Sequence, residues 1–286
     1  MKDYFLLMRL DKPIGFMLLF WPCSWGFAVV LKNMSINQEW IINFFLFFIG
    51  SILMRSAGCV YNDIIDKKID QKVTRTKQRP LASNKLSTFK GWVLVAFLSF
   101  LSLIILFQFN FTAIIFGLSS GILIFAYPFM KRITYWPQLF LGIVFNWGVI
   151  LSYLVFNEEI NIGILLIYLS AVFWTLGYDT IYGLQDAEED IKIGVKSTSI
   201  KFNKKIKQFL VIVYLISISL MIYSNILILN KIKVEIILYI LPLLLLIFQI
   251  QKVEIKNSTQ NLSLFKLNNY YGLSIFIILI IVFYNA

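Results

Sequence analysis

Long apolar segments, separated by polar stretches, constrain the fold of this chain more than any other feature of its sequence. Each segment is close to the ~20 residues that an α-helix needs to cross about 30 Å of hydrocarbon. Charged residues make up only 14% of the chain, whereas about 25% is usual for a soluble domain. The sequence therefore predicts an all-α, polytopic membrane protein with nine transmembrane helices. The predicted spans are residues 14–31, 40–59, 91–108, 111–129, 136–156, 162–182, 208–228, 234–250 and 269–284.

The Lys and Arg residues predict how these helices are oriented. If the N-terminus is cytoplasmic, the polar segments on that side carry 22 of the 26 Lys and Arg residues, and the opposite side carries 3. Arg55 lies within the second span and completes the total. Because cytoplasmic loops are enriched in these residues, we expect a cytoplasmic N-terminus. No long polar linker divides the chain, so we expect residues 1–286 to form a single transmembrane domain.

The composition excludes several kinds of chemistry. The chain has no His, which rules out catalysis by Ser-His-Asp or Cys-His groups and the usual zinc and haem sites. Its net charge of +11 lies in loops, where membrane topology accounts for it, and no nucleic-acid-binding motif is present. Catalysis would therefore depend on Asp, Glu, Lys, Arg, Tyr or Asn and a bound ion.

The first of two acidic clusters follows the second apolar segment. Asn62, Asp66 and Asp70 are spaced four residues apart, so they share one face if the helix continues through them. Carboxylates at this spacing repel one another, and a divalent cation would relieve the repulsion. Mg2+ prefers oxygen ligands and is often held by one or two carboxylates together with substrate phosphates. We therefore expect a magnesium ion at this cluster.

A matching cluster follows the sixth apolar segment. Asp186 and Asp190 are also four residues apart, and Tyr178 and Asp179 lie one to two turns before them. Both clusters fall in long loops on the predicted cytoplasmic side, so their acidic faces could oppose each other. Opposed Asp pairs suit two ions that clamp a diphosphate. The alternative interpretation is that both are simply solvated loop charges.

Basic residues adjoin both clusters. Retention of positive charge on the cytoplasmic side explains Arg75, Arg132 and Lys196 less well than contact with phosphates, which need donors in addition to a metal. An ion-coupled transporter is a rival hypothesis, since carboxylates also line ion pathways. A transporter would carry its acidic residues near the middle of the spans, whereas here they lie at the ends.

Several motifs resemble those of the UbiA superfamily of intramembrane aromatic prenyltransferases. They are RLDKPIG at 9–15, WP at 21–22, RSAGCVYND at 55–63 with Asp70, RT at 75–76, RPL at 79–81, YPFMKR at 127–132, PQ at 137–138, YDTIY at 178–182 with Asp190, and KIGVKST at 192–198. The branch that they resemble most acts on 4-hydroxybenzoate in ubiquinone biosynthesis. Residues 188 and 189 are Glu where members of the family often carry Asp.

The resemblance implies nine transmembrane helices around a central cavity that two Asp-rich cytoplasmic loops cover. It also implies Mg2+, a polyprenyl diphosphate and an aromatic acceptor such as 4-hydroxybenzoate, in a membrane with lipid around the prenyl tail. The expected metal ligands are Asn62, Asp66 and Asp70 for one ion and Asp186 and Asp190 for the other. The expected substrate-binding residues are Arg75, Arg132 and Lys196 at the phosphates, Arg9, Arg55 or Arg132 at the acceptor carboxylate, and Tyr178.

Other roles stay open at the level of sequence. Asp186 or Asp179 would help to activate the acceptor hydroxyl. Homogentisate, a naphthoate, or a haem or chlorophyll precursor would need the same diphosphate machinery as 4-hydroxybenzoate. A bacterial inner membrane is the expected location, and a mitochondrial inner membrane is the alternative. The sequence specifies neither the prenyl chain length nor the oligomeric state.

Overall fold

A computed structural model describes residues 1–284, and these residues form helices with no strand. The helices are α1 (Lys2–Leu7), α2 (Ile14–Val30), α3 (Gln38–Ile65), α4 (Lys67–Asp70), α5 (Thr88–Leu106), α6 (Phe111–Ile133), α7 (Pro137–Phe145), α8 (Gly148–Leu154), α9 (Ile162–Gly183), α10 (Ala187–Lys192), α11 (Thr198–Lys201), η1 (Asn203–Lys205), α12 (Ile206–Leu229), η2 (Val234–Tyr239), α13 (Ile240–Lys252) and α14 (Ser258–Tyr284).

Within this part of the chain, eight helical stretches are long and apolar enough to cross a membrane. They comprise α3, α5, α6, α7 with α8, α9, η1 with α12, η2 with α13, and α14. The ninth apolar helix, α2, has 17 residues, which gives a length of about 26 Å. The protein is therefore an all-α integral membrane protein, as predicted, and nine crossings stay a prediction.

Two elements differ from the sequence prediction. The last helix begins at Ser258, about three turns before the predicted start at residue 269. Its polar first turns are tolerated because Asn261 and Asn268 are fully buried and hydrogen-bonded. The predicted fifth span is interrupted between α7 and α8, where the backbone of Gly148 passes so close to Cys23 that a Cβ atom would overlap its sulfur.

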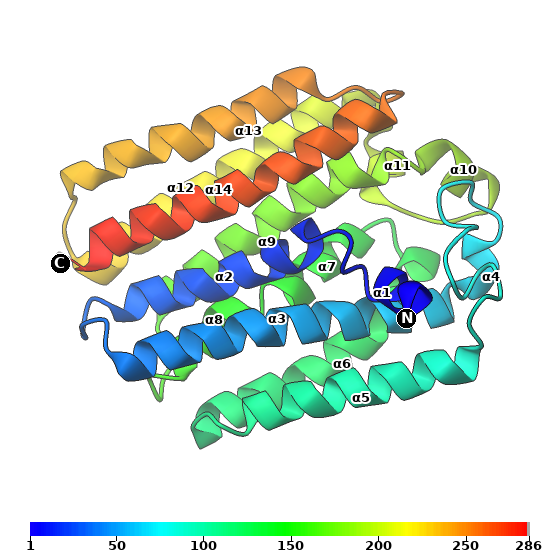
Figure 1. Cartoon of the computed structure of the whole chain (residues 1–286). Coiled ribbons are helices and arrows are strands. Elements are labelled where there is room, and N and C mark those ends of the chain that lie inside the picture. The colour runs from blue at the N-terminus through cyan, green and yellow to red at the C-terminus, as the bar shows by residue number, and fades with distance from the viewer. Residues whose placement is uncertain (285–286) are drawn as a thin grey trace.

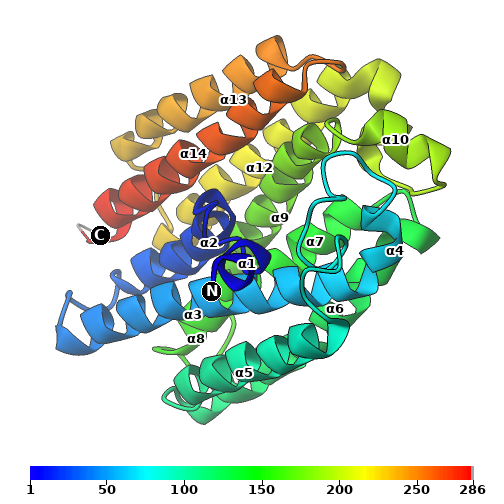
Figure 2. The same ribbon diagram turned by 45° about the vertical axis from the view of Figure 1, so that its right-hand side comes forward.

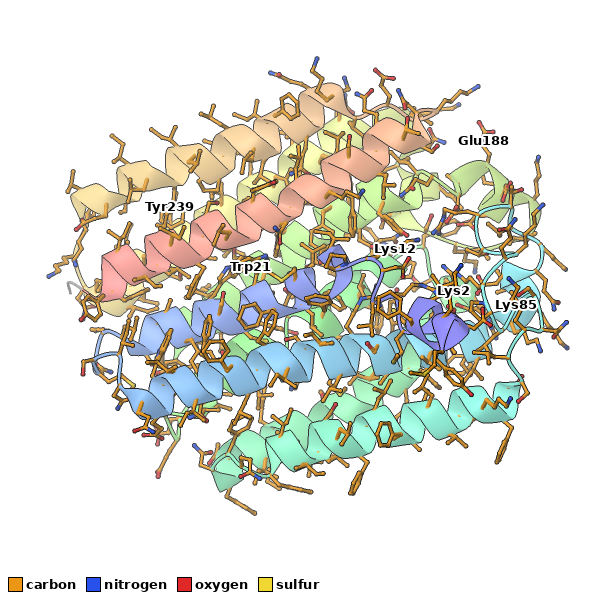
Figure 3. All side chains as sticks on the ribbon, in the orientation of Figure 1. Lys2, Lys12, Trp21, Lys85, Glu188 and Tyr239 are labelled. Atoms are coloured by element: carbon orange, nitrogen blue, oxygen red, sulfur yellow. The ribbon has the colours of Figure 1, made fainter. Side chains whose placement is uncertain are left out.

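The loops that carry the two acidic clusters lie at the same end of the bundle. In Figure 1 the N-terminus, α1, α4 and α10 lie toward the right-hand end, whereas α14 ends at the opposite end. In Figure 2, α4 and α10 again lie together on the right, with the end of α14 on the left. Figure 3 places Lys2, Lys12, Lys85 and Glu188 toward this end and Tyr239 toward the other. The charged loops that the sequence assigns to one side are thus together in space.

Helix α9 forms the centre of the bundle and packs closely on α12. Ser170 and Ser217 each donate a hydroxyl hydrogen bond to the other's backbone carbonyl, over 2.7 and 2.8 Å. One turn along α9 from Trp174, a Cβ atom on Gly177 would overlap the ring of Tyr214. Small residues and reciprocal hydroxyl bonds let helices approach closely in a membrane, where apolar burial supplies little driving force between them.

Polar side chains also attach α14 to its neighbours. The indole N–H of Trp174 donates to Asn268 Oδ1 over 2.8 Å, and the amides of Asn268 and Gln249 pair over 3.2 and 3.3 Å. At the next residue, Asn269 Oδ1 accepts from the indole of Trp21 over 2.9 Å. These bonds connect α14 to α9, α13 and α2, and they satisfy groups that lipid could not.

The close contact between α2 and α8 gives a stability prediction. A methyl group at Gly26 would overlap the backbone carbonyl of Val149, which cannot move aside as a side chain can, whereas Gly50 has open space at its Cβ position. We expect Gly26→Ala to destabilise the protein by about 1–3 kcal/mol and Gly50→Ala to be neutral or slightly stabilising. Thermal unfolding of the two variants in detergent measures this, and equal melting temperatures would contradict the packing described here.

Candidate active site

The first acidic cluster begins where α3 ends. The backbone N–H of Asp66 donates to Asn62 O over 2.9 Å, and that of Asp70 donates to Asp66 O over 2.8 Å. The four-residue periodicity is therefore kept, as predicted. Asp66 itself lies between α3 and α4 with φ −93° and ψ 3°, so the three residues follow a bent rather than a straight helix.

Cations from distant segments hold the carboxylates of this cluster. Asp66 is 0% exposed and forms ion pairs with Lys131 and, over 3.3 Å, with Arg132. Asp70 is 5% exposed and pairs with Arg79 over 2.9 Å. Because an unpaired buried carboxylate is strongly unfavourable, these pairs fix the positions of the bases as well as the acids.

Asp63 is as important to this arrangement as Asp66 and Asp70, although sequence reasoning assigned it no role. Asp63 is 2% exposed and accepts both from Arg9, over 2.7 Å, and from Arg79, over 3.0 Å. The signal that could have found it is its spacing from Asp70, since residues seven apart share a helix face. Arg79 and Lys131 were likewise visible as basic neighbours, but their partners lie too far away in the sequence to be inferred.

Direct contacts join the two acidic loops. Arg75 Nε donates to Asp186 over 2.8 Å, and Arg75 Nη1 donates to the hydroxyl of Tyr182 over 3.0 Å. The backbone N–H of Thr74 donates to a carboxylate oxygen of Glu189 over 2.7 Å. The two loops are therefore in direct contact, through Thr74 and Arg75 of the first and Asp186 and Glu189 of the second.

The pKa values of three carboxyl groups reflect this crowding. Burial raises the pKa of both Asp66 and Asp70, and the nearby Lys131 and Arg79 partly offset the increase. Burial, together with the charge of Asp186, raises the pKa of Asp190 to about 6. A divalent cation would favour the ionised form of all three groups.

A second polar group of residues lies deeper, between the helices. Arg55 on α3 places its guanidinium 5.6 Å from the ring centroid of Phe145 and contacts the thiol of Cys59. Its Nε atom is buried without a hydrogen-bond partner, as is the hydroxyl of Tyr178. Asp179 on α9 is close enough to Arg55 for their charges to interact. The interior thus contains a cation and a hydroxyl with unused hydrogen-bonding capacity.

Two other predicted substrate-binding residues have partners of their own. Lys196 donates to the carbonyl of Ile133 over 3.1 Å and lies 5.7 Å from the ring centroid of Tyr135. Arg132 donates to the carbonyl of Ile65 over 2.9 Å besides its contact with Asp66. Arg132 therefore stands beside the first acidic cluster, and Lys196 contacts the end of α6. Their role at the phosphates stays a prediction.

The fold and the loops together define a class of protein: a helical membrane protein whose site combines carboxylates and bases from two loops at one end. The sequence profile described as the UbiA prenyltransferase family matches residues 19–270. The chain belongs to this family, which confirms the resemblance seen in its motifs.

Curated relatives and solved structures agree with this assignment. Proteins named 4-hydroxybenzoate polyprenyltransferase, mitochondrial, are 46% identical over 210 residues in Drosophila melanogaster and 43% identical over 211 residues in Homo sapiens. These matches cover 73% of this chain and 53% and 56% of the relatives. The chain thus spans about half the length of the curated relatives that it matches.

Two solved structures show the same fold. A UbiA homolog from Aeropyrum pernix has a TM-score of 0.76 at 23% identity, over 93% of this chain and 97% of that one. A UbiA homolog from Archaeoglobus fulgidus, bound to GPP and Mg2+, has a TM-score of 0.67 at 17% identity, over 96% and 99% of the two chains.

The raised pKa of Asp190 predicts how stability depends on pH. Between its ordinary value of 3.8 and about 6, the folded protein holds more protons than the unfolded chain, so the free energy of unfolding falls as the pH rises through this window. Asp190→Asn removes this loss. In ligand-free protein we expect the variant to melt above the wild type at pH 7.5, with a smaller difference at pH 4.5.

Thermal unfolding at the two pH values measures this difference. Glu188→Gln is the matched control, because Glu188 is exposed on the same short helix. A variant Asp190→Asn that melts below the wild type at pH 7.5 would show that the carboxylate stabilises the loop instead.

Proposed function

We propose that this protein transfers a polyprenyl group from polyprenyl diphosphate to 4-hydroxybenzoate, at the ring carbon ortho to the hydroxyl, in a Mg2+-dependent step of ubiquinone biosynthesis. The observation that carries the proposal is the direct contact between the two acidic loops above a buried arginine. The names of the curated relatives support the choice of substrates.

The donor set fits Mg2+. It offers the carboxylates of Asp66, Asp70, Asp186 and Asp190 and the amide oxygen of Asn62, and hard oxygen ligands are those that Mg2+ prefers. In residues 1–284 no three such side chains converge tightly enough to hold an ion by themselves. We infer that substrate phosphates would complete the coordination, and the GPP and Mg2+ bound to the Archaeoglobus fulgidus homolog support this inference.

Exchange of partners explains how the site would accept its ligands. Asp66 forms an ion pair with Lys131, and Asp186 forms one with Arg75. If the two carboxylates bound metal ions instead, Lys131 and Arg75 would be free to bind the phosphates. Arg132 lies beside Asp66, and Lys196 contacts Ile133 at the end of α6; both would add donors. Because the combination of magnesium and diphosphate is nearly neutral, the charge balance of the loops is preserved. When bound, the metal ions would stabilise the charge that develops on the departing diphosphate.

The existing partners of the three arginines favour one candidate for binding the acceptor carboxylate. Arg9 is held by Asp63 through two contacts, and Arg132 by Asp66 and a backbone carbonyl. Arg55 instead contacts a thiol and a ring, and its Nε has no partner. Its unused N–H group can bind an anion in addition to the charge of Asp179, so we assign the carboxylate of 4-hydroxybenzoate to Arg55.

The remaining points are the attack by the acceptor ring, the residue that polarises its hydroxyl, and the location of the prenyl tail. Departure of the diphosphate leaves an allyl cation, which the ring carbon ortho to the hydroxyl attacks, and the ring proton is then lost. Asp179, on α9, is close enough to Arg55 for their charges to interact, whereas Asp186 forms an ion pair with Arg75 between the loops. We therefore favour Asp179 over Asp186 as the group that polarises the acceptor hydroxyl. The apolar tail would extend between the helices toward lipid.

The membrane location follows the same reasoning. The curated relatives are named as mitochondrial proteins, which supports a mitochondrial inner membrane over the bacterial inner membrane expected from sequence.

An ion-coupled transporter fits less well, because the acidic residues lie in loops at one end rather than at the middle of the spans.

The reaction can be tested directly with purified protein in detergent. With an allylic polyprenyl diphosphate, 4-hydroxybenzoate and Mg2+, we expect 3-polyprenyl-4-hydroxybenzoate to form, and excess EDTA to abolish it. Asp66→Ala should lower turnover at least about 100-fold, because one electrostatic contact to developing charge is often worth that much. Turnover only with homogentisate or a naphthoate would reject the acceptor, and folded protein that turns over no acceptor would reject the reaction.

The role of Arg55 has a separate signature. Arg55→Gln should raise the KM for 4-hydroxybenzoate about 10- to 100-fold, the effect of losing a hydrogen bond between charged groups, and leave the KM for the diphosphate nearly unchanged. A neutral acceptor that lacks the carboxylate serves as the control, since its use should be insensitive to the substitution. Equal losses with both acceptors would show that Arg55 does not bind the carboxylate.

A further inference from the structure

Consecutive residues of the first acidic loop contact one turn of the second. Thr74 donates its backbone N–H to Glu189 over 2.7 Å, and Arg75 donates its side chain to Asp186 over 2.8 Å. Asp186 is the residue before α10, and Glu189 lies three positions later on its first turn. Because residues three apart on a helical turn point to the same side, the two contacts form a two-point connection between the loops.

The two contacts differ in what ligand binding would demand of them. Arg75 and Asp186 have to separate if one is to bind phosphate and the other a metal ion. Glu189 and the backbone of Thr74 have no such competing role in the proposed reaction. Glu189 can therefore keep the loops in register while the neighbouring pair exchanges partners.

We propose that Glu189 is a positioning residue that holds the two acidic loops at the separation needed to bind the diphosphate. This inference rests on the proposed function. Glu189 is also one of two positions at which the chain carries Glu where the resemblance leads one to expect Asp. An Asp side chain would be shorter by one carbon–carbon bond, about 1.5 Å, and would fall short of Thr74 unless the loop moved.

Four variants test the proposal. Glu189→Ala removes the acceptor, Glu189→Asp shortens it, and Glu189→Gln keeps an oxygen at the same reach. Glu188→Ala is the matched control, because Glu188 is a neighbouring exposed glutamate that projects outward from α10 in Figure 3. All four substitutions lie in a short loop helix, outside the apolar spans.

The first measurement does not depend on activity. Hydrogen exchange of a peptide over residues 71–79, in ligand-free protein, reports the Thr74 amide. We expect exchange about fivefold faster in Glu189→Ala and Glu189→Asp than in the wild type, and close to wild type in Glu189→Gln and Glu188→Ala. Equal exchange in all variants would overturn the contact, whether or not the protein proves to be a prenyltransferase.

The second measurement separates positioning from general damage. In the prenyl transfer assay, Glu189→Ala should raise the KM for the diphosphate about fivefold while kcat stays within twofold, with the KM restored in Glu189→Gln. A fall in kcat at unchanged KM, or identical behaviour of Glu188→Ala, would overturn the positioning role. If the wild type itself shows no transfer, the proposed function fails, and the exchange data still decide whether Glu189 connects the loops.

Discussion

Charge pairing of buried carboxylates is the constraint on which the rest of the site depends. Asp63, Asp66 and Asp70 have almost no access to solvent, and each would be strongly unfavourable without a cation. Their partners come from the N-terminal segment, from the loop after α4 and from the end of α6. Burying three acids within about two helical turns therefore requires three separate segments to meet, and under the proposed function the same cations would be available to an incoming anion.

Between the helices the charged group with incomplete pairing is a cation, the guanidinium of Arg55. Arg55 is a cation among rings, a thiol and hydroxyls, and one of its N–H groups has no partner. An unpartnered N–H group of this kind lowers stability. Under the proposed function the acceptor carboxylate would take up this N–H group, and the diphosphate with its metal ions would occupy the loops.

What the sequence could predict follows from the range over which each feature is determined. Apolar segments and the four-residue spacing of the Asp residues are local, and both are found in the structure. The partner of Asp63 is Arg9, 54 residues away, and no local pattern specifies that pairing. The early start of α14 and the break before Gly148 were missed for a related reason, because both depend on residues of other helices. Trp174 of α9 bonds to Asn268, and Cys23 of α2 lies against Gly148.

The polar face of α14 also bears on how the chain enters a membrane. Asn261, Asn268 and Asn269 lie in its first half, and polar side chains there make insertion of an isolated helix unfavourable. Asn268 and Asn269 bond to Trp174, Gln249 and Trp21, on helices that are all synthesised earlier, and Asn261 bonds to Glu254 in the segment just before α14. Helix α14 would therefore integrate against helices that are already in place, rather than by partitioning alone.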